Sequence, residues 1–255
     1  MGGAVLLECE GPLARVTLSH PGRFNAMSRA MWRSLKIVFE DVQTRTELRV
    51  VVVCGQDGHF CAGGDISEYP AFRFDAATLR DFHENDVWGG LNAMLACDLP
   101  LFAQIEGNCM GAGVEIASCC DIRLASQGAR FGAPIARLGF PMAPREAQLV
   151  AREAGLATAR EMLLEAAVLD AAEMKARGFL HAVWPDADVA RQTQLRALRA
   201  SQLAPQAARL NKQTLRSLAS QPLPAELMAG AYGYADSAEH REGVGAFMAK
   251  RKPAF

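Results

Sequence analysis

The chain has 255 residues, of which 50% are hydrophobic and 22% are charged, and its formal net charge at pH 7 is −1. This composition is typical of a globular protein and excludes disordered and collagen-like chains. Lysine and arginine are scattered along the sequence, so the strongly basic stripe of a nucleic-acid-binding protein is absent.

The cysteines and the apolar runs indicate the cellular compartment of the protein. Cysteine occurs seven times, an odd number, and no pair has the spacing of zinc ligands, so we expect a reducing compartment with neither disulfides nor a metal site. No stretch approaches the ~20 apolar residues of a membrane helix, and the N-terminus lacks the basic and apolar regions of a signal peptide. We therefore expect a cytoplasmic protein that binds neither membrane nor nucleic acid.

Hydrophobic patterning predicts strands that alternate with helices. Predicted strands cover residues 5–7, 15–18, 50–54, 101–105 and 122–125, and predicted helices cover 31–42, 79–96, 111–118, 145–153, 157–164 and 171–177. Ser28 is the expected cap of the first helix. The run at 50–54 is β-branched without alternation, as in a strand buried on both faces. The pattern predicts a parallel α/β fold, and the mostly helical chain after residue 189 predicts a C-terminal helical subdomain.

Two glycine-rich loops follow two of the buried strands. The first, at 60–66, reads Phe-Cys-Ala-Gly-Gly-Asp-Ile; the second, at 106–115, reads Glu-Gly-Asn-Cys-Met-Gly-Ala-Gly-Val-Glu and opens a helix. Small residues let a ligand approach the backbone closely, and the first N–H groups of a helix are unpaired. Two such loops can form an oxyanion hole, a pair of N–H donors that stabilises charge on a carbonyl oxygen.

The same loops carry a resemblance to a known family. With Ser67 and Glu68, the first loop resembles the first oxyanion-hole motif of the crotonase superfamily, in particular its enoyl-CoA hydratase/isomerase family, and the second loop resembles the second motif. Further stretches similar to the family, all in the family's order, lie at 23–27, 120–123, 131–134 and 239–255. The resemblance therefore covers almost the whole chain.

This resemblance implies a fold and an assembly. The expected fold is α/β of the crotonase type, a spiral of β-β-α turns that forms two roughly perpendicular sheets surrounded by helices. Residues 1–195 are the expected core with the acyl-CoA site, and residues 196–255 the expected helical region that assembles a homotrimer, or a hexamer of two trimers. No cofactor is implied, because coenzyme A enters as part of the substrate.

The resemblance also implies roles for residues of the two loops. The backbone N–H groups of Gly64 and Ala112 are the expected oxyanion hole, and Glu115 is the expected catalytic base. A glutamate in the first turn of a helix is also favoured by the helix dipole alone, which is the structural alternative for Glu115.

The resemblance also implies contacts with coenzyme A, but it assigns them to individual residues less specifically. Ala62, Asp65 and Ile66 are expected to line the pantetheine and adenine with backbone atoms. Arg23 and Lys250 are candidates for phosphate contacts, and Lys250 is expected to reach a neighbouring subunit. For both cations the alternative is a solvated surface charge.

One departure from the family pattern leaves the reaction open. The second catalytic glutamate of the hydratases corresponds to Ile135, which cannot transfer a proton, and the aspartate of other branches corresponds to Ala143. Glu146 is the nearest replacement acid, although its place just after Pro144 is also explained as an ordinary first helical turn. We expect no catalytic role for His59, His83 and His181.

The expected activity is hydration of trans-2-enoyl-CoA, with the enolate held in the oxyanion hole. Isomerisation, thioester hydrolysis and decarboxylation use the same hole, so they remain alternatives within the family. An acyl-CoA-binding protein that has lost its activity is the alternative from another class, and Ile135 with the altered 141–146 segment favours it.

Overall fold

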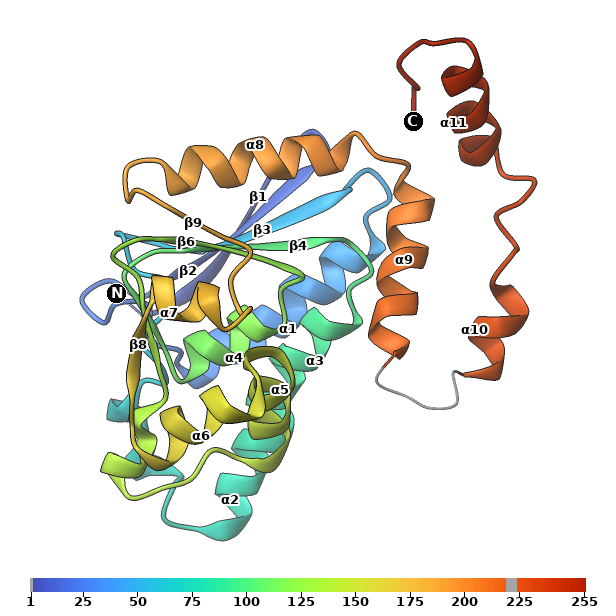
Figure 1. Ribbon diagram of the computed structural model, residues 1–255. Coiled ribbons are helices and arrows are strands. Elements are labelled where there is room, and N and C mark those ends of the chain that lie inside the picture. Colours follow the sequence, from blue (N-terminus) through green and yellow to red (C-terminus); the bar gives the residue numbers. More distant parts are fainter. Residues whose placement is uncertain (1, 219–223) are drawn as a thin grey trace.

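The computed structural model describes residues 2–218 and 224–255, and its main sheet has six strands (Figure 1). The strand order is β1-β2-β3-β4-β6-β9. β1 and β2 pair antiparallel, and every later neighbour pair is parallel. The strands span β1 (Ala4–Glu10), β2 (Leu13–Ser19), β3 (Val50–Gly55), β4 (Leu101–Ile105), β6 (Ile122–Ser126) and β9 (Ala182–Trp184). The predicted α/β class and the five predicted strands are confirmed.

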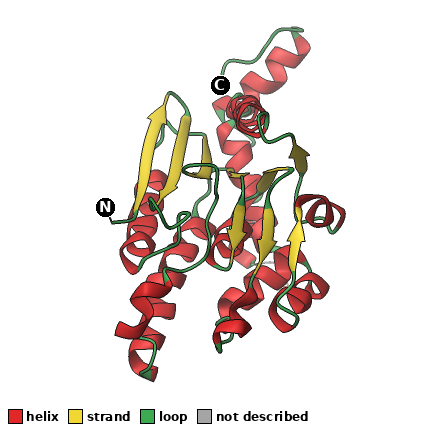
Figure 2. Ribbon diagram, turned by 90° about the vertical axis from the view of Figure 1, so that its left-hand side faces the viewer, coloured by secondary structure: helices red, strands yellow, loops and turns green. Residues whose placement is uncertain are grey.

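A second, smaller sheet has three short strands in the order β5-β7-β8. β5 (Asn108–Met110) runs parallel to β7 (Arg130–Gly132), which pairs antiparallel with β8 (Val168–Asp170). Figure 2 shows these strands as a group apart from the long β1–β2 ribbon. β5 lies inside the second glycine-rich loop, so this sheet helps to place that loop.

The helices fill the connections between strands. Those before residue 180 are α1 (Arg29–Thr44), α2 (Ala76–Asp81), α3 (Trp88–Ala96), α4 (Ala112–Ser118), α5 (Pro144–Ala154), α6 (Leu156–Leu164) and α7 (Ala171–Ala176), with 3₁₀ turns at η1 (Ile66–Ala71) and η3 (Pro134–Leu138). Ser28 caps α1 as predicted, because its side chain accepts a hydrogen bond from the Met31 N–H at 3.2 Å. The predicted helix at 79–96 is interrupted by a π-helical turn, η2 (Phe82–Val87).

The main sheet is buried on both faces. On β3, Val51 and Val53 belong to the large core cluster, which also includes Trp32 of α1, whereas Val50 and Val52 belong to a smaller cluster with Ala197 of α8 (Val189–Ser201). Figure 1 shows α8 over one face of the sheet and α1, α3 and α4 on the opposite side. This two-sided burial explains the unalternated valines of the strand.

Beyond α8 the chain continues as α9 (Pro205–Ser217), α10 (Ala225–Gly230) and α11 (Ala238–Met248), with α10 and α11 standing away from the sheet (Figure 1). The predicted division near residue 196 falls within α8 and stays a prediction. Among the described residues, no helix is both long enough and apolar enough to cross a membrane.

Candidate active site

The two glycine-rich loops pack directly against each other. Cys61 and Asn108 are joined by an N–H···O bond of 2.8 Å, and Met110 donates to the Cys61 carbonyl oxygen at 2.8 Å. A Cβ atom at Gly113 would lie 2.5 Å from that same carbonyl oxygen, so a larger residue there would force the loops apart. Gly111, with φ of 46°, makes the turn that starts α4.

Two residues of these loops, each with a backbone amide that is unpaired within the described part of the chain, line one cavity. Gly64 and Ala112 both line a cavity of about 270 Å³. Among the described residues neither amide donates to a protein acceptor, although the adjacent amides of Asp65 and Gly111 donate to carbonyl oxygens at 2.9 and 2.8 Å. Two unpaired amide donors on residues that line one cavity are compatible with an oxyanion hole.

The carboxyl of Glu115 lies in the same cavity, one turn into α4. Its residue is 8% exposed, and no protein hydrogen bond to its side chain is present among the described residues. Burial, with a smaller contribution from the charge of Glu146, raises the pKa of Glu115 from its ordinary 4.5 to about 8. A carboxyl with its pKa near neutrality suits a group that both takes and gives a proton.

Glu146 does not line this cavity, but it contacts a histidine that does. The carboxyl lies at the start of α5, is buried, and does not itself line the cavity. Its Oε1 lies 3.1 Å from Nδ1 of His83, whose ring does line the cavity. His83 stands on the π-helical turn η2, a distortion that often marks functional positions. Ile135 lines the cavity as well.

The remaining wall is mainly apolar and aromatic. Besides the residues already named, it includes Trp32, Tyr69, Phe82, Val87, Leu138, Phe140 and Met142, together with one cation, Arg73. A Cβ at Gly64 would collide with the Tyr69 hydroxyl, so glycine at this position leaves room for the tyrosine. The cavity therefore offers two amide donors and an acid on a surface suited to a hydrocarbon chain.

Comparison with known proteins places the chain in a family. The family described as enoyl-CoA hydratase/isomerase matches residues 8–255. The chain belongs to the enoyl-CoA hydratase/isomerase family. It is similar to 2,3-dehydroadipyl-CoA hydratase from Escherichia coli, with 33% identity over 94% of this chain and 93% of the relative.

Solved structures of the enoyl-CoA hydratase/isomerase family confirm the crotonase-type fold. An enoyl-CoA hydratase/carnithine racemase from Magnetospirillum magneticum is 35% identical, covers 99% of this chain and 95% of its own, and has a TM-score of 0.95. AtuE from Pseudomonas aeruginosa is 34% identical, covers 98% of both chains and has a TM-score of 0.91. Membership in this family supports the processing of acyl-CoA substrates.

The residues predicted to contact coenzyme A are not all at the cavity. Ala62 and Ile66 line it beside Gly64. Asp65 is instead turned into the protein, where Ser67 donates to it from both its N–H and its hydroxyl, and Arg23 pairs with it at 2.9 Å. Burial opposes ionisation of Asp65, but these hydrogen bonds and charges lower its pKa overall. Lys250 follows α11 and does not line the cavity of its own chain.

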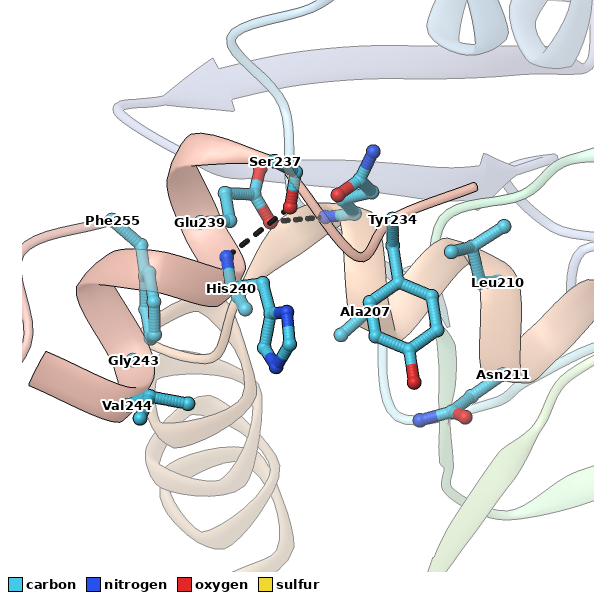
Figure 3. Close-up of a pocket in the computed structure, with 12 residues that line it drawn as sticks. Ala207, Leu210, Asn211, Tyr234, Ser237, Glu239, His240, Gly243, Val244 and Phe255 are labelled. Atoms are coloured by element: carbon cyan, nitrogen blue, oxygen red, sulfur yellow. Dashed lines mark hydrogen bonds between the residues drawn. The ribbon is translucent and has the colours of Figure 1, made fainter. Parts of the chain in front are cut away.

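A second cavity, of about 400 Å³, lies between α9 and α11 (Figure 3). Its polar groups serve local structure: Ser237 accepts from the His240 N–H at 3.2 Å, and Glu239 accepts from the Gln206 N–H at 2.7 Å. Neither glycine-rich loop reaches it. The smaller cavity, where the two loops meet, is therefore the candidate active site.

Three polar residues of the candidate site were not predicted from the sequence. Tyr69 lies in the short 3₁₀ turn η1 and Arg73 follows that turn, whereas His83 lies within the π turn η2. A sequence signal was available for Tyr69 and Arg73. Both are aromatic or charged residues in the loop that follows the first oxyanion-hole motif. No pattern in the sequence announces a π turn, so nothing distinguished His83 from a surface histidine.

Proposed function

We propose that this protein hydrates the double bond of a trans-2-enoyl-CoA. The observation that carries the proposal is the meeting of two unpaired amides, from Gly64 and Ala112, with a carboxyl of raised pKa, Glu115, in one apolar cavity. The relative from Escherichia coli is named as a hydratase of an unsaturated acyl-CoA, which agrees with the proposal.

In the proposed reaction the thioester oxygen accepts hydrogen bonds from the two amides. Ionised Glu115 takes a proton from water while the water oxygen bonds to the β carbon. The electrons of the double bond move to the thioester oxygen, and the resulting enolate is stabilised by the amides. A proton then joins the α carbon and the carbonyl reforms, so that one water molecule has been added without a metal or redox cofactor.

His83 is our candidate for the second proton transfer. Ile135 occupies the position of the missing carboxylate, and Glu146 does not line the cavity, so Glu146 is not placed to touch substrate. Because Nδ1 of His83 faces Glu146 at 3.1 Å, Nε2 is the nitrogen left for the substrate. We therefore assign proton transfer to His83 and a positioning role to Glu146, in place of the direct role considered for Glu146 from the sequence.

We also propose that the chain assembles as a trimer or a hexamer through its C-terminal helices. Tyr232, Val244, Phe247 and Met248 are large apolar side chains exposed on this arm of the single chain. Lys250 would then contact coenzyme A in a neighbouring subunit. Light scattering during gel filtration measures the mass; a monomer contradicts the assembly, and Phe247→Glu is expected to reduce the mass of the assembly.

The test of function is incubation of the purified protein with short trans-2-enoyl-CoAs and mass analysis of the products. Hydration adds the mass of one water. An unchanged mass with a shifted double bond supports isomerisation, and release of free CoA supports hydrolysis. If every enoyl-CoA is bound but returned unchanged, hydration is wrong and the non-catalytic alternative gains.

A further inference from the structure

Arg73 is a cation in the wall of the active-site cavity with no anion beside it. It follows the 3₁₀ turn η1, is partly buried, and its N–H donates to the Tyr69 carbonyl oxygen at 2.9 Å. Within the described residues, its guanidinium has neither a carboxylate within ion-pair distance nor a hydrogen-bond acceptor. Burial lowers the pKa of Arg73, and Tyr69 opposes this shift.

The two buried aspartates among the described residues, Asp65 and Asp86, are each paired with arginine. Asp86, on the π turn, accepts from Nε of Arg29 and from Nε of Arg33, each at 2.6 Å. Asp65 pairs with Arg23. Removing a charge from water without a partner is costly, so a partly buried cation left without one in a ligand cavity indicates that the ligand supplies the anion.

The side chain of Arg73 is held in place by two aromatic rings. Its guanidinium carbon lies 3.7 Å from the ring centre of Phe140 and 4.5 Å from that of Tyr69. The two rings are themselves in an edge-to-face contact with centres 5.8 Å apart. Contact with aromatic rings engages the faces of the planar guanidinium and leaves N–H groups at its edge free for a bidentate bond to a carboxylate.

Tyr69 stands between this guanidinium and the reacting end of the cavity. Its hydroxyl occupies the space beside Gly64. Burial is the main cause that raises the pKa of Tyr69; the charge of Arg73 opposes this rise, and the charge of Glu115 adds to it. Arg73 and Glu115 both line the cavity, but among the described residues no ion pair or hydrogen bond joins them.

We propose that Arg73 binds a carboxylate at the far end of the acyl group, so that the preferred substrate is the CoA thioester of an unsaturated dicarboxylic acid. This proposal rests on the proposed function for the identity of the site, and it deepens that function by naming the class of substrate. The apolar walls accommodate the carbon chain, and Arg73 accounts for the charge at its end.

The test pairs each dicarboxylic acyl-CoA with the monocarboxylic acyl-CoA of the same length. Saturated pairs of four, six and eight carbons are titrated calorimetrically into wild type, Arg73→Met and Arg73→Lys. Methionine retains an apolar side chain between the two rings and removes the charge. At the length that fits best, wild type is expected to bind the carboxylated ligand about 10- to 100-fold more tightly.

Arg73→Met is expected to abolish that preference and to leave the affinity for the uncharged ligand unchanged, and Arg73→Lys to keep part of the preference. Equal weakening of both ligands would assign Arg73 to the phosphates of coenzyme A and overturn the proposal. No preference in wild type at any length would mean that Arg73 only packs against the rings, which also overturns it.

The calorimetric titrations use saturated ligands and need no turnover. They therefore test the role of Arg73 separately from the proposed function. A carboxylate preference without hydration of the matching 2-enoyl-CoAs supports the role of Arg73 and contradicts hydratase activity. Hydration of both members of a pair at equal rates, with equal affinity for their saturated counterparts, supports hydratase activity and contradicts the role of Arg73.

Discussion

The buried carboxyl of Glu146 and the imidazole of His83 are 63 residues apart in sequence, yet Glu146 Oε1 lies 3.1 Å from His83 Nδ1. The contact joins the first turn of α5 to the π turn η2. It orients a histidine at a cavity where Ile135 has replaced the acid known from related enzymes. This contact supports our proposal that His83, on a different element from Ile135, is the second proton-transfer group.

Glu115→Gln is expected to lower turnover by ~10²–10⁴-fold, because the amide cannot take a proton from water. Binding of a saturated acyl-CoA should change little, since the side chain keeps its size. Steady-state hydration and calorimetry measure the two effects. Glu84→Gln is the control for the same chemical change away from the cavity, because Glu84 lies on the π turn η2 and pairs with Arg145. Equal losses in both variants contradict a special role for Glu115.

The raised pKa of Glu115 predicts a pH-dependent stability difference between wild type and Glu115→Gln. Between pH 4.5 and 8 the folded carboxyl holds a proton that the unfolded one has lost. Unfolding therefore releases a proton, and wild-type stability falls as pH rises through this window, by at most about 1.4 kcal/mol per pH unit. Relative to wild type, the glutamine variant should gain a few kcal/mol across the window and nothing further above it. Urea melts at several pH values measure this, and a pH-independent difference contradicts it.

The same pKa predicts the pH profile of the reaction. Glu115 acts as a base only when ionised, so the limb of the kcat/KM profile that Glu115 controls should rise with pH up to about 8. The charge of Glu146 contributes to raising this pKa, so Glu146→Gln should move the rising limb to lower pH. An unmoved limb would show that the two carboxyls do not interact.

His83 and Glu146 are expected to act as one unit. If Glu146 only orients the imidazole, the double variant His83→Gln/Glu146→Gln should be no slower than His83→Gln alone, because removing the histidine already removes the carboxylate's effect. Multiplied losses would mean independent roles. His240→Gln, in the cavity between α9 and α11, is the matched control and should leave hydration unchanged.

Ala112→Pro tests the amide of the oxyanion hole without removing a side-chain function. Ala112 is the first residue of α4, where proline is tolerated because the missing N–H makes no helical hydrogen bond. The variant should lose about 10²–10³ in kcat, as when other oxyanion donors are removed. Ala112→Gly keeps the N–H and should remain close to wild type, and thermal melting checks that both variants fold. Full activity in the proline variant would exclude this amide from the mechanism.

Local patterning determined much of the fold. The valines of β3 and the cap at Ser28 act over a few residues, and the structure confirms the elements predicted from them. The two glycine-rich loops were recognisable because close backbone approach requires small residues at fixed spacing. The placement of Gly64, Ala112 and Glu115 around one cavity followed from the same motifs.

Tertiary structure decided the rest. Strands β5, β7 and β8 have three residues each, too few to show a period, and they form only by pairing with each other. The π turn η2 joins α2 to α3, is tied to α1 through the pairing of Asp86 with Arg29 and Arg33, and carries the His83 that contacts Glu146. Arg73 differs from an ordinary surface arginine only in the folded structure, where it lines the cavity and has no carboxylate partner among the described residues. A sequence states which groups are present, but the pairing of a buried charge depends on neighbours that are distant along the chain.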